Sequence, residues 1–364
     1  MNQERGNPAG RRERDKLNTI LAMEYKDDAL HMIDQRKLPH TYEIFVAHTY
    51  QEVDFAIKDM VVRGAPAIGA AAGYGAALAA KAYENEEMRV FLTKMEESLD
   101  RLNRSRPTAV NLMWAVKRMK KLIQAHQDLP TKELAQRILE EAHAIVNEDQ
   151  AINLAMGEHG NTVISQGATI LTHCNTGALA TVGIGTALGV VRTAHNAGKN
   201  IFVYADETRP RLQGGRLTAW ELMQEGIPAT LIADSVAATL IRDGKIDVIL
   251  VGADRIATNG DTANKIGTFM LSVIAKTYGV PFYVVAPTTT IDFEINHGSQ
   301  IIIEERNSEE VTHIEGVHVA PEGMQVYNPA FDVTPNENIT GIVTEQGIVR
   351  APFNENIIKL KNNR

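Results

Sequence analysis

The stretch ATILTHCNTGALATVGIGTALGVVRTAHNAGKNIFVYADETRP, residues 168–210, decides the fold of the second half of the chain. It begins with a short apolar run at residues 168–172 and ends in another at residues 200–205. Residues 178–197, between the two runs, favour a helix. A strand, a helix and a second strand in this order are typical of a βαβ unit, whose two strands are parallel.

The same alternation continues toward the C-terminus. Further apolar runs predict strands at residues 229–233, 247–253 and 281–287. Helices are predicted at residues 217–225, 235–243 and 266–278. The repeated unit indicates an α/β fold with a parallel sheet and helices on both faces. Ligands of such sheets bind at the carboxyl ends of the strands, so the residues after each apolar run are the first candidates for a site.

The first half of the chain has a different pattern. Four segments are rich in alanine or carry apolar residues at helical spacing: residues 70–82, 90–102, 109–126 and 131–160. Two extended stretches, near residues 20–23 and 42–46, predict a small sheet. We therefore expect a mainly helical N-terminal domain, residues 1–150, and an α/β C-terminal domain, residues 151–364. The length of 364 residues agrees with two domains.

Composition narrows the possible partners. The chain has 37 Lys and Arg against 45 Asp and Glu, a net charge of −8, so we expect no general nucleic-acid binding. No apolar run approaches the ~18 residues of a transmembrane helix, and the charged first residues do not form a secretory signal. We expect no membrane association and a cytoplasmic location. The single cysteine, Cys174, excludes an internal disulfide and a multi-cysteine zinc site.

Cys174 is the first candidate for chemistry, because it follows the apolar run at residues 168–172. A lone cysteine is most often a small core residue. Here it lies between two polar residues at a strand-to-helix junction, where a helix N-terminus would favour the thiolate and apolar surroundings the thiol. The sequence leaves both a core role and a catalytic role open.

Asp254 is the second candidate, because it comes directly after DVILVGA at residues 247–253. An aspartate at such a place more often caps a helix or pairs with a neighbour, here Arg255. In a closed and poorly hydrated pocket, however, a carboxyl group keeps its proton more readily and can donate it. Asp254 is therefore a candidate general acid.

Two arginines stand immediately before helix starts and could bind an anion. VRGAPAIG, residues 62–69, contains Arg63 before a glycine and a proline that suit a helix N-terminus. Arg106 stands in the same way before Pro107 and Thr108. With Lys265 and the glycine-rich segment 213–215, they predict a phosphate pocket.

Common cofactor motifs are absent from the sequence. It contains no GxGxxG, GxxxxGK[ST], HExxH or GxSxG motif, so dinucleotide, nucleotide, zinc-protease and serine-hydrolase interpretations lack their markers. The eleven histidines show no metal-ligand spacing. We expect neither a metal nor a cofactor.

Taken together, the chain closely resembles the methylthioribose-1-phosphate isomerases, the aldose–ketose isomerases of methionine salvage. The matching segments run in family order over residues 17–360: VRGAPAIG (62–69), SRPTAVNLMWA (105–115), LTHCNTGALAT (171–181), ETRPRLQGGRLTAWEL (207–222), VGADRIATNGDTANKIGT (251–268) and VYNPAFDVTP (326–335). The wider superfamily includes ribose-1,5-bisphosphate isomerases and the regulatory subunits of translation initiation factor 2B.

The resemblance implies a fold, a reaction and a set of site residues. It implies a helical N-terminal domain, a Rossmann-like C-terminal domain, and a homodimer that works on a small sugar phosphate without metal or nucleotide. The substrate would be 5-methylthioribose 1-phosphate and the product 5-methylthioribulose 1-phosphate. Cys174 and Asp254 match the catalytic residues, Asp254 as proton donor. The residues that match substrate contacts are Arg63, Gly64, Ala65, Arg106, Gln213, Asn264 and Lys265.

Three alternatives remain from the sequence. A sister isomerase of a related sugar, such as 5-deoxyribose 1-phosphate, would keep the same catalytic residues. A ribose-1,5-bisphosphate isomerase would need a further cation site, and the sequence shows no surplus Arg/Lys cluster for one. A non-catalytic regulatory protein is disfavoured by the presence of Cys174, Asp254 and Lys265 together. Within the isomerase hypothesis, Cys174 is either a base in a proton relay or a group that shields a hydride shift.

Overall fold

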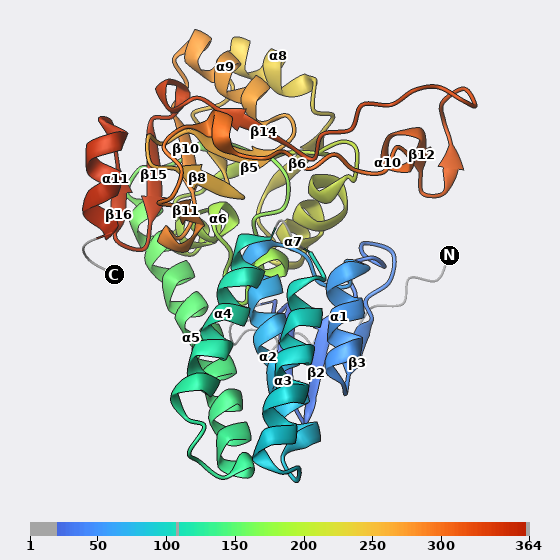
Figure 1. The fold of residues 1–364 in the computed structure, drawn as a ribbon. Coiled ribbons are helices and arrows are strands. Elements are labelled where there is room, and N and C mark those ends of the chain that lie inside the picture. Colours follow the sequence, from blue (N-terminus) through green and yellow to red (C-terminus); the bar gives the residue numbers. More distant parts are fainter. Residues whose placement is uncertain (1–19, 107–108, 362–364) are drawn as a thin grey trace, which may run out of the picture.

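A small antiparallel sheet opens the computed structural model, which describes residues 20–106 and 109–361 (Figure 1). Its strands are β1 (Met23–Lys26), β2 (Ala29–Ile33) and β3 (Ile44–Ala47). The predicted sheet is present, but the first strand lies later than expected and β2 was missed. The β1–β2 turn consists of Asp27 and Asp28, both with positive φ, at 51° and 54°. Such a turn more commonly carries Asn-Gly, so the sequence held no clear hairpin signal.

Five helices complete the N-terminal part. They are α1 (Tyr50–Lys58), α2 (Ala65–Tyr83), α3 (Met88–Asn103), α4 (Val110–Ala125) and α5 (Thr131–Asn161). The four predicted helical segments are confirmed. Helix α2 lies at the centre and packs against the other four. Its alanines and glycines are buried on nearly every side, so its neighbours approach closely and fix the place of its N-terminus. Pro107 and Thr108, expected at the start of α4, lie outside the described residues.

The C-terminal part is built on a seven-stranded sheet in the order β16-β15-β10-β7-β4-β5-β6. Its strands are β4 (Thr169–Thr172), β5 (Phe202–Asp206), β6 (Ala229–Ile232), β7 (Val248–Val251), β10 (Phe282–Val285), β15 (Gly341–Thr344) and β16 (Gly347–Val349). All neighbours are parallel except β16, which is antiparallel to β15. The five predicted strands are confirmed.

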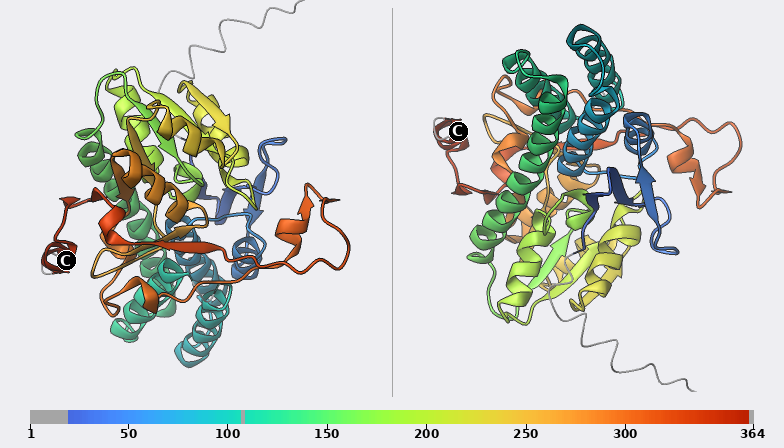
Figure 2. Two further views of the ribbon diagram at one scale, coloured as in Figure 1. Left: turned by 90° about the horizontal axis from the view of Figure 1, so that it is seen from above. Right: turned by 90° about the horizontal axis from the view of Figure 1, so that it is seen from below.

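Helices cover both faces of this sheet (Figure 2). In the strands inside the sheet, alternate residues enter two separate cores, as Ile170 and Leu171 of β4 illustrate; the edge strand β6 is largely exposed. One core includes side chains of α8 (Val236–Arg242), α9 (Thr268–Tyr278) and α11 (Phe353–Lys361), and the other includes those of α5 and α6 (Ala187–Asn196). A parallel sheet buried on both faces explains the continuous apolar runs of the sequence. The predicted α/β fold class is confirmed.

The strand order reverses between β4 and β7. From β4 the chain proceeds to β5 and β6 on one side, and then returns to place β7 on the other side of β4. Such a reversal opens a crevice at the carboxyl ends of the two strands. Cys174 follows β4 and Asp254 follows β7, so the topology places both candidates at this crevice.

The predicted helix at residues 178–197 is wrong in its first half. Residues Ala178–Ala180 form a single 3-10 turn, and α6 begins only at Ala187. The segment between them folds back on the loop after β4, because the Thr186 N–H donates to the Thr176 carbonyl at 2.8 Å. The Leu188 N–H also bonds the Thr176 hydroxyl, at 3.2 Å. Tertiary contacts at the site thus override a helix-favouring sequence.

A second, four-stranded sheet was not predicted. It has the order β11-β8-β9-β14, with β11 (Ile291–Asp292), β8 (Arg255–Ala257), β9 (Thr262–Lys265) and β14 (Phe331–Thr334). The chain between β11 and β14 leaves the body as an arm that carries the hairpin β12 (His313–Ile314) and β13 (Val317–His318), seen in each view of Figures 1 and 2.

Helix α5 joins the two parts of the molecule. It packs against α2 and also against α6, and residue 150 lies inside it. The division of the chain into domains 1–150 and 151–364 therefore stays a prediction. Among the described helices, none has the length and apolar character needed to cross a membrane.

Candidate active site

A cavity of about 300 Å³ lies at the crevice between β4 and β7. Its walls come from both parts of the molecule: the starts of α2 and α4, the loops after β4 and β7, the four-stranded sheet and the base of the arm. All nine residues predicted for the site line this one cavity: Arg63, Gly64, Ala65, Arg106, Cys174, Gln213, Asp254, Asn264 and Lys265. Segments spread over about two hundred residues of sequence therefore meet where the strand-end rule places a ligand.

Cys174 is held in an unusual backbone conformation. Its φ is 66°, in the left-handed region that a residue with a side chain rarely adopts. The surrounding hydrogen bonds fix both sides of the residue: its N–H donates to the Thr208 hydroxyl at 2.8 Å, and its carbonyl accepts from the Thr218 hydroxyl at 2.7 Å. The residue as a whole is 7% exposed to solvent. Strained residues held in this way cluster at functional sites.

Asp254 lies between β7 and β8, with its N–H donating to the Ala263 carbonyl at 2.9 Å. Burial raises the pKa of Asp254, since a carboxylate loses hydration in the cavity. Four cations oppose the shift in pKa without cancelling it: Lys265, Arg306, Arg106 and Arg63. A carboxyl group in this environment retains its proton to higher pH than usual and is suited to act as a general acid.

The start of α2 contributes the Arg63–Gly64–Ala65 segment. Gly64 has a φ of 94°, and a Cβ atom there would lie 2.3 Å from the Ala180 carbonyl oxygen, so only glycine fits. The N-cap residue Gly64 has no side chain to bond the first N–H groups of α2, and such a helix N-terminus suits an anion. Arg63 donates from Nη1 to Asn175 Oδ1 at 3.2 Å and from Nη2 to the Asn175 carbonyl at 3.3 Å.

Strand β9 supplies Asn264 and Lys265 to the same cavity. Lys265 Nζ donates to the Ala330 carbonyl at 2.9 Å and lies 4.2 Å from the centre of the Phe331 ring. Burial, together with the nearby Arg306, lowers the pKa of Lys265 to about 8. Asn264 donates to the Thr268 hydroxyl at 2.9 Å.

Gln213 and Arg106 complete the predicted set. Gln213 Oε1 is buried and has no hydrogen-bond partner among the described residues. An acceptor buried in a cavity wall without a partner suits a ligand hydroxyl. Burial lowers the pKa of Arg106, and the neighbouring Arg306 lowers it further.

Sequence reasoning missed Arg306. This residue lines the cavity, its Nε donates to Glu304 Oε1 at 3.2 Å, and its guanidinium lies 5.6 Å from the centre of the Phe331 ring. Lys265 and Arg306 therefore share one aromatic ring. Arg306 belongs to the arm and follows no strand of the main sheet, so the strand-end rule could not find it.

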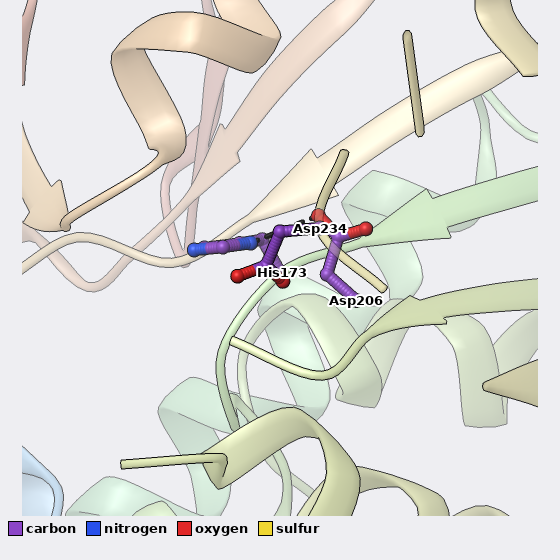
Figure 3. Close-up of side chains that lie close together, drawn as sticks. All are labelled: His173, Asp206 and Asp234. Atoms are coloured by element: carbon purple, nitrogen blue, oxygen red, sulfur yellow. Dashed lines mark hydrogen bonds and ion pairs between the residues drawn. The ribbon is translucent and has the colours of Figure 1, made fainter. Parts of the chain in front are cut away.

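His173, next to Cys174, forms a buried cluster with Asp206 and Asp234 (Figure 3). Its Nδ1 is 2.9 Å from Asp206 Oδ2 and its Nε2 is 2.8 Å from the Ile266 carbonyl oxygen. Although burial opposes a charged ring, the hydrogen bond and charge of Asp206 raise the pKa of His173. A ring with both nitrogens donating satisfies these contacts and has no lone pair for a metal.

Asp234 is also engaged, since its two oxygens accept the N–H groups of Thr208 and Arg209 at 2.7 and 2.8 Å. Among the described residues this is the cluster with ligand atoms close enough to hold a metal ion. Its hydrogen bonds suit a structural link better: His173 connects the loop after β4 to the end of β5 through Asp206, and to the loop after β9 through the Ile266 carbonyl.

Known proteins were compared with the chain and its fold. Residues 61–351 match the initiation factor 2 subunit family. The methylthioribose-1-phosphate isomerase of Thermoanaerobacter sp. (strain X514) is 69% identical over 345 residues, covering 95% of this chain and 100% of that protein. The isomerase of the same name from Caldicellulosiruptor saccharolyticus is 56% identical over 338 residues, covering 93% of this chain and 98% of that one.

Two solved structures have the same fold. The 5-methylthioribose 1-phosphate isomerase of Pyrococcus horikoshii OT3 superposes with a TM-score of 0.91 at 48% identity, covering 95% of this chain and 97% of that chain. A protein from A. fulgidus described as translation initiation factor eIF-2B, subunit delta, gives 0.84 at 43% identity, covering 94% and 100%. The chain belongs to the initiation factor 2 subunit family and, within it, to the methylthioribose-1-phosphate isomerases.

Proposed function

We propose that this chain is the aldose–ketose isomerase that converts 5-methylthioribose 1-phosphate to 5-methylthioribulose 1-phosphate in methionine salvage. The observation that carries the proposal is the cavity itself, where a carboxyl group with a raised pKa and a thiol lie within a set of buried cations. The full-length identity of 69% to a protein named for this activity supports the same reaction.

The cations suit the phosphate group of the substrate. Arg63 and Arg106 stand before helix starts, and Lys265 lines the same cavity. A doubly charged phosphate offsets the repulsion among these groups, which explains why so many cations gather in a chain of net charge −8. Apolar side chains line other parts of the cavity and suit a methylthio group: Met60, Ile68, Val110, Ala286, Pro287 and Ile301.

We propose the following order of events. Phosphate blocks the anomeric oxygen of the substrate, so the sugar ring opens first. Asp254 protonates the ring oxygen as the bond from that oxygen to C1 breaks. Hydrogen then moves from C2 to C1, and the C2 hydroxyl loses its proton as the ketone forms, which returns a proton to Asp254. Cys174 contacts the reacting carbons as a base or as a shield for the shift.

The activity has a characteristic pH dependence. We expect kcat/KM to fall by about tenfold per pH unit above pH 8, because Lys265, whose pKa is lowered to about 8, loses its charge there. Below pH 8 Lys265 keeps its ammonium charge, so the titration of this group causes no change in kcat/KM there. Lys265→Arg keeps its charge, so the fall moves to higher pH. Rates measured from pH 6 to pH 10 on both proteins check this. An unchanged fall in the variant would assign it to another group.

Arg306 is expected to bind the substrate anion. Its Nε is held by Glu304, whereas its two Nη groups make no hydrogen bond to any described residue and remain for a ligand. Arg306→Gln should raise KM by about tenfold to a hundredfold, the range for a lost hydrogen bond to a charged group, with a smaller change in kcat. Arg350→Gln is the control, because Arg350 also stacks on a ring, that of Tyr283, but does not line the cavity. Equal KM values for both variants would remove Arg306 from the site.

Parallel kinetics on three sugars test the choice of substrate. Purified protein is assayed with 5-methylthioribose 1-phosphate, 5-deoxyribose 1-phosphate and ribose 1,5-bisphosphate. We expect the first to give the highest kcat/KM, and the second to follow within about a hundredfold, because a pocket distinguishes small apolar groups weakly. The highest value on the bisphosphate would assign Arg306 to a second phosphate and overturn the proposal. No heat of binding with any of the three would favour a regulatory protein.

We also propose that the chain works as a homodimer in the cytoplasm. Apolar side chains on the arm are largely exposed, including Val317 at 64%, Met324 at 65% and Tyr327 at 81%. Such a patch supports a protein interface. Sedimentation equilibrium should give twice the chain mass of 40.0 kDa. A monomer at all concentrations would contradict this part.

A further inference from the structure

Glu221 is a fully buried carboxylate that does not line the cavity. It lies on α7 (Ala219–Gln224), behind the loop that carries Cys174. We propose that Glu221 is a positioning residue. It holds the loop of residues 174–179 and, through Asn175, fixes the position of the Arg63 guanidinium, which binds the phosphate. The inference rests on the proposed function for the role of Arg63.

Four donors converge on the Glu221 carboxylate. Oε1 accepts from Asn175 Nδ2 at 2.8 Å and from the Leu179 N–H at 3.3 Å. Oε2 accepts from the Ala178 N–H at 2.8 Å and from the Arg192 guanidinium. Three of the four donors belong to the loop of residues 174–179. Ala178 and Leu179 begin the short 3-10 turn, so the carboxylate accepts from the first N–H groups of that turn, which the turn itself leaves unpaired.

Asn175 transmits the position of Glu221 to the cavity. A carboxylate can only accept, so the NH₂ group of the Asn175 amide must face Glu221. Its Oδ1 then faces the other way and accepts from Arg63 Nη1 at 3.2 Å, while the Asn175 carbonyl accepts from Nη2 at 3.3 Å. Glu221, together with the Thr218 hydroxyl that accepts from the same Nδ2 group at 3.3 Å, thus holds the orientation of the amide, and the amide positions the guanidinium of Arg63.

The loop passes so close to the carboxylate that a side chain would not fit. A Cβ atom on Gly177 would lie 2.1 Å from Glu221 Oε2. The backbone of Gly177 therefore packs directly against the carboxylate, and the path of the loop depends on Glu221. Cys174 begins the same loop in a left-handed conformation, so a shift at residues 175–179 would also move the thiol.

Arg192 balances the buried charge and supplies a matched control. It is 5% exposed and pairs with Glu221 and, at 2.5 Å, with Glu225. Both glutamates are thus partners of the same guanidinium. Only Glu221 also bonds the loop of residues 174–179; the side chain of Glu225 bonds Arg192 alone among the described residues.

The test compares Glu221→Gln with Glu225→Gln, each of which neutralises one partner of Arg192. We expect Glu221→Gln to raise both KM for the sugar phosphate and the inhibition constant of inorganic phosphate by about tenfold or more. Glu225→Gln should leave both within about twofold. Melting temperatures, measured for both, show whether they lose similar stability. Equal effects of the two variants on KM, or no effect of Glu221→Gln, would overturn the proposal.

Two further variants separate this role from general disruption. In an Arg63→Gln background, Glu221→Gln should add less than about twofold to KM, because its effect passes through Arg63. An additive effect there would contradict the route. If Glu221→Gln does not fold, Asn175→Ala cuts the same connection and should give the same rise in KM. Calorimetry with inorganic phosphate keeps the test independent of the proposed reaction. If the wild-type protein has no isomerase activity, the proposed function is wrong. The phosphate affinities of the wild-type and Glu221→Gln proteins would still test the role of Glu221.

Discussion

Asp254→Asn is expected to lower kcat by about a hundredfold to ten-thousandfold, the usual contribution of a general acid. The amide has nearly the same shape but cannot protonate the ring oxygen, so ring opening becomes slow. KM should stay unchanged or fall, because the amide, unlike a carboxyl group, can never place a negative charge among the cations that would hold the phosphate. Initial rates over a range of substrate concentrations separate the two constants. A kcat within threefold of the wild type would remove Asp254 as the acid.

The same variant should be at least as stable as the wild type at pH 7. A raised pKa means that the fold disfavours the ionised form of Asp254, so the carboxylate costs stability above its ordinary pKa. A neutral amide removes that cost. An equal or higher melting temperature, measured at pH 7, would show that the lost activity does not come from misfolding, as at other sites where function opposes stability.

Cys174→Ser is expected to reduce kcat by about a hundredfold or more, with the fold intact. The hydroxyl fits the space of the thiol, but a hydroxyl ionises far less readily than a thiol, so little of its basic form is available, and it is a less polarisable neighbour for a migrating hydrogen. The hydrogen bonds of the Cys174 backbone to Thr208 and Thr218 do not involve the side chain, so the left-handed conformation should survive. Near-normal turnover would show that the thiol is a packing residue.

Labelling distinguishes the two roles of this thiol. When the reaction is run in D₂O, a proton relay through Cys174 can bring solvent deuterium to C1 of the product. A hydride shift carries the substrate hydrogen from C2 to C1 without exchange. Full deuterium incorporation at C1 would contradict the hydride shift, whereas its absence is compatible with a shift or with a relay shielded from water.

The main sheet and the position of Cys174 and Asp254 at one edge of it were predictable because simple periodicities decide both. Strands buried on two faces read as continuous apolar runs, and the residues after them fall at one edge of the sheet. The runs before Cys174 and Asp254 belong to β4 and β7, which are neighbours. The strand order itself, which makes this edge the switch point, could not be obtained from the runs alone.

Other features depend on contacts that no local pattern reveals. Residues 178–186 favour a helix, yet their bonds to Thr176 hold them as a loop against the site. In the sequence, Glu221 is an ordinary polar residue of a predicted helix. It is buried only because α7 packs against the loop of residues 174–179. Arg306 lies on the arm, and the Phe331 ring that it shares with Lys265 is 25 residues further along the chain.

The most direct test of the central claim is a nuclear magnetic resonance spectrum of the reaction mixture. Purified protein is incubated with 5-methylthioribose 1-phosphate labelled with ¹³C at C2. We predict that a ketone resonance appears at C2, that the ³¹P signal stays that of a phosphate ester, and that the Asp254→Asn protein leaves the substrate unchanged over the same time. A substrate untouched by the wild-type protein, or release of inorganic phosphate in place of a ketone, would contradict the account.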